Sequence, residues 1–479
     1  MGSALRATAY QVQQMKIMRR MPAWCSGVGR SIAAPLLIAA ILRLGLLLAA
    51  WLRTGTRIIT QGDTESYLQP GRNLIFHGIY AAAGRPEIDR TPGYPIFLML
   101  AGMAVNNVLI TGFVQIIVSL FSLVLIYKIA NRSFPNSRAG LIAAWLFALD
   151  PVSIVYTVRL LPETLFVLLL LISIERLLAF HGSGKLSRVA SAGLSLAAAT
   201  YVRPVSYYLV LPLAAALAFA LPKNSWKAPA VLLLATAPLL GAWQVRNAIE
   251  TGYSGFSSIV EKNLYFYQSA EVTAELHGIS LHAEQSALGY DSEESYLAVH
   301  PEQRSWTISQ RLRYMRSQSV AILSQHRLAY LRSHFKGVGL VALTPAATEL
   351  LQLVDLYPQS QSMPSRVLNE GIFRSTAEVA LRHPGVMSFM VIMTTWVVIL
   401  YALAAQSYRS GSASRFASVL LAGIAIYFLL ISGGPQAVGR YRVPIMPELC
   451  ILAAGGLVAL RTKAKRGHQD PAYAVPAIM

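Results

Sequence analysis

The sequence predicts an all-α, multi-pass membrane protein, and three observations lead to this fold class. Hydrophobic residues make up 54% of the 479 residues and charged residues only 13%, whereas soluble domains carry about 25% charged residues. The mean hydropathy is +0.48. Apolar stretches of about 20 residues, each long enough to cross the hydrocarbon core, recur along the chain. Because these stretches are continuous rather than alternating, a transmembrane β-barrel is excluded.

Ten apolar stretches are predicted as membrane spans. They cover about residues 32–52, 111–131, 138–156, 160–180, 187–201, 205–221, 228–246, 386–406, 415–433 and 443–460. Lysine and arginine mark cytoplasmic loops, and here they occur in alternate loops, so ten crossings leave both termini inside. Two shorter stretches, 94–108 and 337–349, are predicted as interfacial or re-entrant segments. Counting both as spans gives twelve, so the prediction is a bundle of about 10–12 transmembrane helices.

The order of the spans predicts five parts. They are a cytoplasmic N-terminal tail (1–31), a transmembrane catalytic module (32–246) with a first outer loop at 53–110, an extracytoplasmic region (247–385), C-terminal transmembrane helices (386–460) and a cytoplasmic tail (461–479). The extracytoplasmic region is the most polar, and its apolar residues recur at helical spacing. It is therefore predicted to be mostly helical and solvated or interfacial. Its basic residues leave open an alternative role in binding anionic lipid head groups.

Charge and cysteine content narrow the class of protein further. The net charge is +19, which in a soluble protein would suggest nucleic acid. Positive cytoplasmic loops explain this excess, so no nucleic-acid partner is predicted. The two cysteines, Cys25 and Cys450, form neither a disulfide framework nor a metal-binding pattern. These features fit a bacterial inner (plasma) membrane protein and leave the endoplasmic reticulum open as an alternative.

Ionisable residues gather on the predicted outer face of the membrane. The segments that carry them are residues 60–67, 90–95, 150–163, 201–204, 243–247 and 439–444. Because such groups are costly near a membrane, their convergence on one face predicts a site. Asp63 is the strongest signal, since no lysine or arginine lies within five residues of it. Its alternative role is to cap the helix that follows.

Several of these residues have structural explanations that the sequence leaves open. Arg159 and Glu163 are four residues apart at a helix start, so they could simply pair with each other. Arg203 precedes Pro204 and could be a snorkelling side chain in a tight turn. Arg246 could be an interfacial anchor. Arg43 lies well inside the first span, where it needs a partner or a wet cavity.

The outer-loop motifs resemble those of the GT-C superfamily of polyprenyl-phosphate-sugar-dependent glycosyltransferases. The nearest groups are the family 39 protein-mannosyltransferase-like and aminoarabinose-transferase-like branches. These have an acidic residue in the first outer loop and then an Arg/Lys-x-Pro-x-Tyr-Pro segment, which here correspond to Asp63 and residues 90–95. Residues 162–166, 203–204, 243–247 and 440–444 resemble further family positions in the same order. The resemblance covers residues 32–260 and 415–460. Many relatives have two adjacent acidic residues, whereas Thr64 separates Asp63 from Glu65.

The resemblance implies a GT-C-type helical bundle and an integral-membrane hexosyl- or pentosyltransferase. Such an enzyme moves a sugar from a polyprenyl-phosphate-linked donor to an acceptor hydroxyl at the outer (periplasmic) face, with inversion. Membrane lipids surround it, and the acceptor is a lipid, a glycan or a protein. Asp63 is predicted as the catalytic residue, either as the base or as the carboxylate that positions the acceptor. The predicted substrate-binding residues are Glu65, Tyr67, Arg90, Tyr94, Arg159, Glu163, Arg203, Arg246, Arg440 and Arg442.

No cluster of metal-ligating residues is visible in the sequence, so no metal ligand is predicted. A divalent cation stays possible but is not favoured, because arginines can neutralise a phosphate without one. The alternative function is a flippase, transporter or binding protein for lipid-linked sugars. That class predicts polar residues near mid-span, broken helices and internal symmetry. Apart from Arg43, the centres of the predicted spans lack ionisable residues, which favours the enzyme.

Overall fold

The computed structural model describes residues 25–57, 59–60, 62–135, 137–220, 226–358, 372–411 and 413–469. Most of the predicted N-terminal tail and the end of the C-terminal tail therefore lie outside the described residues. Helices dominate the described chain, and its two short strands, β1 (Ala81–Ala82) and β2 (Arg85–Pro86), form one antiparallel hairpin. The predicted all-α class is confirmed.

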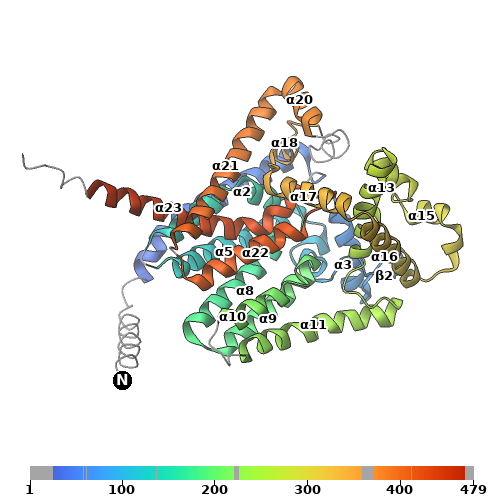
Figure 1. The fold of residues 1–479 in the computed structure, drawn as a ribbon, viewed down its shortest axis with the longest axis horizontal. Helices are drawn as coiled ribbons and strands as arrows, with labels where there is room; N and C mark the ends of the chain where they lie inside the picture. The colour runs from blue at the N-terminus through green and yellow to red at the C-terminus, as the bar shows by residue number, and fades with distance from the viewer. Residues whose placement is uncertain are drawn as a thin grey trace, which may run out of the picture.

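The helices of the N-terminal half form much of the bundle, which the last helices of the chain complete (Figure 1). Their bounds are α2 Cys25–Thr54, α3 Thr64–His77, α4 Gly93–Leu100, α5 Val108–Ser133, α6 Ala139–Ala148, α7 Pro151–Val158, α8 Glu163–Ser183, α9 Leu186–Val202, α10 Val210–Ala220 and α11 Lys227–Thr251, with short 3₁₀ turns η1 (Met103–Val105) and η2 (Pro204–Ser206). Helices α8, α9 and α11 pack side by side, and α5 packs on α8.

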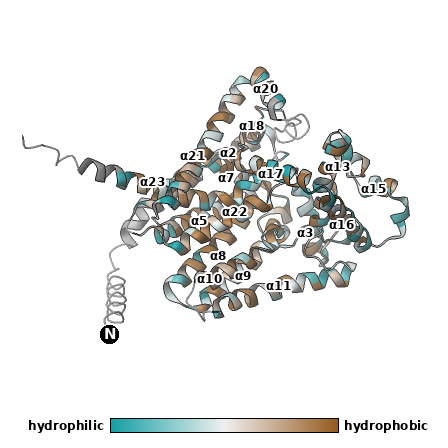
Figure 2. Ribbon diagram, viewed as in Figure 1, coloured by the Kyte–Doolittle hydropathy of each residue, from teal (hydrophilic) through white to brown (hydrophobic). Residues whose placement is uncertain are grey.

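The second half adds an outer group of helices and then returns to the bundle. The outer group is α12 Ile259–Asn263, η3 Leu264–Ser269, α13 Ala270–His277, α14 Leu281–Ala287, α15 Glu293–Val299, η4 Pro301–Ser305, α16 Ile308–Gln325 and α17 Arg327–Leu343. The returning elements are α18 Ala347–Leu353, α20 Ile372–Arg382, α21 Pro384–Ser410, α22 Arg415–Ile431, η5 Gly439–Ile445 and α23 Met446–Gln469. Figure 2 shows hydrophobic colouring over the bundle and more hydrophilic colouring over α13, α15 and α16.

Within the described residues, six helices are long and apolar enough to cross a membrane. They are Ile32–Thr54, Val108–Ser133, Glu163–Ser183, Lys227–Thr251, Pro384–Ser410 and Gly439–Lys463. The pair α6 and α7, bent by 55°, makes a seventh if it is one broken span. The other three predicted spans correspond to helices of 17 residues or fewer, at α9, α10 and α22. The chain is thus a multi-pass membrane protein.

The two predicted interfacial segments contain only short or interrupted helix. Residues 94–108 form α4 and η1, which are separated by Gly102 at a φ of 132°. A side chain at Gly93 would come within 2.7 Å of the backbone of Tyr201, so this glycine lets α4 lie directly against α9. Residues 337–349 span the end of α17 and the start of α18.

The structure identifies the partners of Arg43, which is fully buried in α2. Its guanidinium donates to Ser119 Oγ at 3.0 Å and to the carbonyls of Ala148 and Phe147 at 3.3 and 3.4 Å. These carbonyls belong to the last turn of α6, where no amide of the same helix is available to bond them. Arg43 therefore caps the break between α6 and α7, where its charge also suits the negative helix end.

Candidate active site

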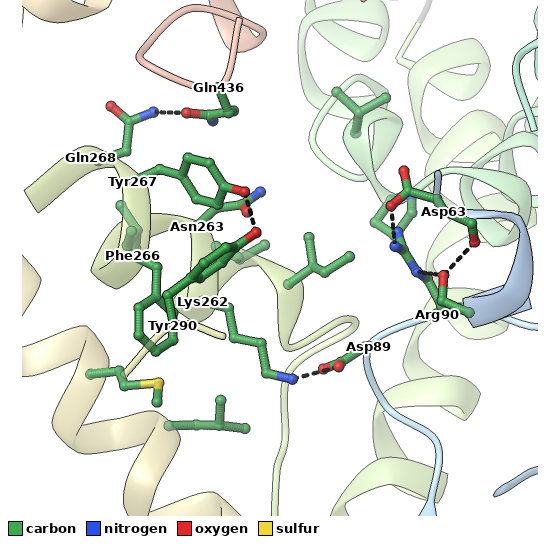
Figure 3. Close-up of a pocket in the computed structure, with 18 of the residues that line it drawn as sticks. Asp63, Asp89, Arg90, Lys262, Asn263, Phe266, Tyr267, Gln268, Tyr290 and Gln436 are labelled. Carbon is green, nitrogen blue, oxygen red and sulfur yellow. Dashed lines mark hydrogen bonds and ion pairs between the residues drawn. The ribbon is translucent and has the colours of Figure 1, made fainter. Parts of the chain in front are cut away.

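A pocket of about 900 Å³ lies between the bundle and the outer helices. Its bundle side comes from the start of α3, the loop before α4, the turn after α9 and the first residues of η5. Its outer side comes from η3, the loop between α14 and α15, and α16. Asp63 and Arg440, which are 377 residues apart in sequence, thus share one cavity. Figure 3 shows these two sides facing each other.

Asp63 projects into this pocket from the residue before α3. Although it occupies the N-cap position, its side chain makes no capping hydrogen bond. Instead, Arg90 Nη2 donates to Asp63 Oδ1 at 2.9 Å and Arg440 Nη1 donates to Oδ2 at 2.8 Å. The structure therefore pairs Asp63 with two arginines and does not use it as a helix cap.

A second carboxylate, that of Glu163, also binds Arg440. Glu163 is the first residue of α8, and its side chain is 0% exposed. Arg440 Nε donates to Glu163 Oε1 at 2.5 Å, and Arg203 Nη1 lies 2.9 Å from the same oxygen. Arg440 therefore bridges the two carboxylates. We refer to Asp63, Glu163, Arg90, Arg203 and Arg440 as the charged cluster.

The charged cluster carries one positive charge in excess, because three guanidinium groups face two carboxylates. Burial alone would raise the pKa of Asp63, but the charges and hydrogen bonds of Arg440 and Arg90 outweigh burial and hold this pKa below its ordinary value. Asp63 is therefore ionised at neutral pH. The surplus charge makes the cluster attractive to an anion such as a phosphodiester.

Arg90 is held on several sides by neighbouring groups. Its Nε donates to Ser66 Oγ at 2.9 Å, and its Nη1 donates to Tyr67 OH at 3.2 Å. The guanidinium also lies 4.6 Å from the centre of the Tyr67 ring, within cation–π range. Tyr80 OH donates to the backbone carbonyl of Arg90 at 2.8 Å, which ties the loop before α4 to the β1–β2 hairpin.

Other predicted site residues lie outside this pocket. Glu65 is on the exposed face of α3, where its side chain is 74% exposed and 3.6 Å from Arg72. Tyr94 is buried beneath Tyr67, and its hydroxyl donates to Gln115 Oε1 at 2.8 Å. Arg159 does not pair with Glu163. Its Nη2 is 3.5 Å from the carbonyl of Glu349.

Two arginines that were predicted to bind substrate instead bond backbone carbonyls. Arg442 is fully buried, and its Nη1 donates at 2.9 Å to the carbonyls of Val341 and Ala342 in the last turn of α17. Arg246 donates to the carbonyls of Glu87 at 2.7 Å and Tyr80 at 2.8 Å, and it lies 4.9 Å from the ring centre of Trp243. Arg246 therefore holds together the two ends of the β1–β2 hairpin. This hairpin directly precedes Arg90 in the chain.

The outer wall of the pocket contains residues that the sequence analysis did not identify. Tyr267 and Tyr290 share a hydrogen bond between their hydroxyls, and Lys262 pairs with Asp89, both at 2.5 Å. Asn263 also points into the cavity (Figure 3). Apart from Asp89, these residues belong to the segment 247–385, which matched no family motif. The structure supplies a signal that the sequence did not: η3 is a π-helical segment, a feature that often marks functional sites.

The described residues contain no group of three or more His, Cys, Asp or Glu side chains that could hold a metal ion. Both oxygens of Asp63 are instead bonded to guanidinium groups. The neutralising charge in this site thus comes from arginine side chains.

The fold and site define a helical, multi-pass membrane protein with an arginine-rich pocket at one end of its bundle. Residues 89–245, about a third of the chain, match the family model described as dolichyl-phosphate-mannose-protein mannosyltransferase. This match confirms the resemblance to the GT-C glycosyltransferase superfamily. It includes Arg90, Glu163 and Arg203 of the charged cluster.

Solved structures of two proteins are similar over most of this chain. The oligosaccharyltransferase AglB from Archaeoglobus fulgidus, in complex with an inhibitory peptide and a dolichol-phosphate, is 13% identical with a TM-score of 0.46, covering 94% of this chain and 52% of its own. ArnT from Cupriavidus metallidurans, bound to undecaprenyl phosphate, is 12% identical with a TM-score of 0.34, covering 95% of this chain and 82% of its own. The chain thus spans about half the length of the oligosaccharyltransferase. No curated protein matches the chain.

Proposed function

We propose that this protein is a glycosyltransferase that moves a hexose or pentose from a polyprenyl-phosphate-linked donor to an acceptor hydroxyl. The observation that carries the proposal is the charged cluster. In this cluster an ionised Asp63 is bonded to two arginines, and the three guanidinium groups exceed the two carboxylates by one charge. The cluster lies inside a pocket large enough for a substrate. A transferase that uses such a donor needs these two elements together: a base and a cationic site for the leaving phosphate.

The arginines of the cluster would hold the donor phosphate. A sugar-phosphate diester carries one negative charge, and this charge rises as the glycosidic bond breaks. Guanidinium groups held in place before the reaction stabilise such developing charge without further reorganisation. Arg90, Arg203 and Arg440 all line the pocket. Their fixed geometry, imposed by Asp63 and Glu163, suits planar contacts to phosphate oxygens.

Asp63 would accept the proton of the acceptor hydroxyl. In this step the hydroxyl oxygen forms a bond to the anomeric carbon, the bond from that carbon to the phosphate oxygen breaks, and the electron pair leaves with the polyprenyl phosphate. General-base assistance of this kind contributes about 10²–10⁴-fold. An ionised carboxylate has about four lone-pair sites, so Asp63 can accept from a hydroxyl while both arginines stay bound. A single direct attack inverts the anomeric centre.

The same residues suggest where the reaction takes place. The loop positions of Asp63, Arg90 and Arg440 agree with a site at the outer face of a bacterial inner membrane, where the donor lipid would stay in the bilayer.

Asp63 and Glu163 have guanidinium partners in the cluster. We therefore propose that phosphate neutralisation by arginine does not require a divalent cation.

The test is transfer from a radiolabelled polyprenyl-phosphate-sugar pool in membranes that contain wild type, Asp63→Asn or Glu65→Gln at matched expression. Glu65 is the matched control, because it is an acidic residue two positions away whose side chain lies outside the pocket. We expect Asp63→Asn to lose at least 10²-fold of the transfer rate with donor binding retained, and Glu65→Gln to stay within twofold. Undiminished transfer by Asp63→Asn refutes the catalytic role. If wild type transfers no sugar but moves the labelled lipid across the bilayer, the protein is a transporter.

A further inference from the structure

We propose that the outer wall of the pocket is an acceptor subsite for a saccharide, formed by Asn263, Tyr267 and Tyr290. This inference rests on the proposed function and specifies its acceptor class as a glycan hydroxyl. All three residues line the same cavity as Asp63. In Figure 3 they lie across the cavity from Asp63 and Arg90. An acceptor whose hydroxyl reaches Asp63 would therefore extend toward this wall.

The hydrogen-bonding groups of Asn263, Tyr267 and Tyr290 are uncharged and only partly used. Tyr267 and Tyr290 share one hydrogen bond between their hydroxyls, so one proton and several lone pairs stay available. Among the described residues, the amide of Asn263 has no hydrogen-bond partner, and this amide can both donate and accept. The neighbouring Lys262 is neutralised by Asp89 at 2.5 Å. The wall thus offers clustered neutral donors and acceptors.

Aromatic rings give this wall an apolar side as well. The ring of Tyr290 lies 5.5 Å from that of Tyr267 and 5.4 Å from that of Phe266, at interplanar angles of 83° and 61°. Such packing fixes the rings in place. A sugar presents adjacent hydroxyls at its rim and apolar C–H groups on its faces, so it matches both features. A lipid chain would leave the hydroxyls and the amide without partners, which is costly.

The cavity also has room for an acceptor beside the donor sugar. Its volume of about 900 Å³ is near the upper end of the roughly 300–1,000 Å³ that is typical of small-molecule sites. The donor phosphate belongs at the charged cluster on the bundle side, next to the membrane helices that its lipid would follow. The outer wall comes from η3 and from the loop between α14 and α15, away from those membrane helices. This side of the cavity is therefore left for the acceptor.

The first experiment measures binding of the full-length, detergent-solubilised protein to a printed array. One field carries neutral bacterial oligosaccharides, and a second carries unglycosylated peptides with serine and threonine. The variants are Asn263→Leu, Tyr267→Phe and, as a matched control, Tyr265→Phe. Tyr265 belongs to the same π-helical segment, but its hydroxyl contacts His300 outside the pocket. We expect wild type to bind glycans and each pocket variant to bind them about three- to tenfold more weakly. The control is expected to bind like wild type.

Binding to peptides in place of glycans, or glycan binding that the pocket variants leave unchanged, would overturn the proposal, as would no binding by wild type. A second assay separates this result from failure of the proposed function. It follows slow hydrolysis of a polyprenyl-phosphate-hexose and of a polyprenyl-phosphate-pentose, in which water takes the place of the acceptor. The water oxygen bonds to the anomeric carbon, its proton goes to Asp63, and the polyprenyl phosphate leaves with the electron pair. Sugar release by wild type without glycan binding refutes only the acceptor subsite. Glycan binding by a protein that neither hydrolyses these donors nor transfers their sugars refutes the transferase and leaves a saccharide-binding site.

Discussion

Replacement of Arg440 by glutamine tests the central feature of the site, because this side chain bridges Asp63 and Glu163. Arg440 is 15% exposed, and its bonds measure 2.8 Å to Asp63 and 2.5 Å to Glu163. The Arg440→Gln variant removes the surplus positive charge of the cluster. It leaves Asp63 with Arg90 and Glu163 with Arg203. We expect about a 10²–10³-fold loss of kcat, the usual effect of removing one stabilising donor from developing charge.

The stability of the same variant follows from where its two bonds lie. The bond to Asp63, a side chain that is 40% exposed, contributes at most about 1 kcal/mol. The bond to the buried Glu163 contributes about 1.5–3 kcal/mol. We therefore expect a loss of about 2–4 kcal/mol in the free energy of unfolding. The variant Glu163→Gln/Arg440→Gln should recover part of this loss, because it no longer buries a carboxylate short of one partner.

The assay combines sugar transfer in proteoliposomes with the melting temperature of the purified protein. Arg440→Lys is the intermediate case, since a lysine keeps the charge but cannot span two carboxylates as a guanidinium fork does. Transfer should therefore fall in the order wild type, lysine, glutamine. If Arg440→Gln keeps a kcat within threefold of wild type, the assignment of the charged cluster to phosphate stabilisation is wrong. If the double variant melts no higher than Arg440→Gln, the bridging argument fails.

Three further predictions concern pH, the hairpin and metal. Because the pKa of Asp63 is lowered in the folded protein, the ionised Asp63 contributes its full stabilisation above the unfolded pKa of about 3.9. This stabilisation is lost only as the pH falls through the lower folded pKa. A pH profile of transfer should therefore show no Asp63 titration between about pH 5 and pH 8. Arg246→Lys should lower the melting temperature almost as much as Arg246→Gln, because one ammonium group cannot replace a guanidinium that binds two carbonyls. If Arg246→Lys instead restores most of the transfer that Arg246→Gln loses, Arg246 is a phosphate ligand. Dialysis against EDTA should leave transfer unchanged, and recovery of lost activity on adding Mg²⁺ or Mn²⁺ would contradict charge neutralisation by arginine.

Much of the architecture could be predicted because membrane insertion depends on composition and length. Apolar stretches near residues 32–52, 111–131 and 386–406 correspond to helices that satisfy both criteria. The span predicted at 138–156 is broken, since Asp150 accepts a hydrogen bond from the backbone of Ser153 and starts a new helix at Pro151. The presence of Asp150 and Pro151 gave a local signal of this break. The 55° bend and the use of Arg43 to cap it depend on neighbouring helices.

The candidate site was predictable in its residue types and only partly in its membership. An arginine at a membrane face is either a ligand-binding group or a cap for backbone carbonyls, and its local sequence is the same in both cases. Arg440 and Arg442 illustrate this, because they are two residues apart in one 3₁₀ turn. Arg440 faces the pocket, whereas Arg442 points to the end of α17. A turn of three residues directs such side chains apart, but which one meets the pocket depends on what packs around it.

The sequence by itself determined that this is a helical, multi-pass membrane protein, and it located six of the apolar helices and the loop that carries Asp63. These properties follow from local composition and from short motifs, which need no knowledge of distant residues. Only the tertiary structure decided which cations meet Asp63 and Glu163, that Arg246 holds a hairpin, and that Asn263, Tyr267 and Tyr290 form the opposite wall. These contacts join residues that are far apart in the chain, and their formation depends on the packing of whole helices rather than on any pattern within one segment.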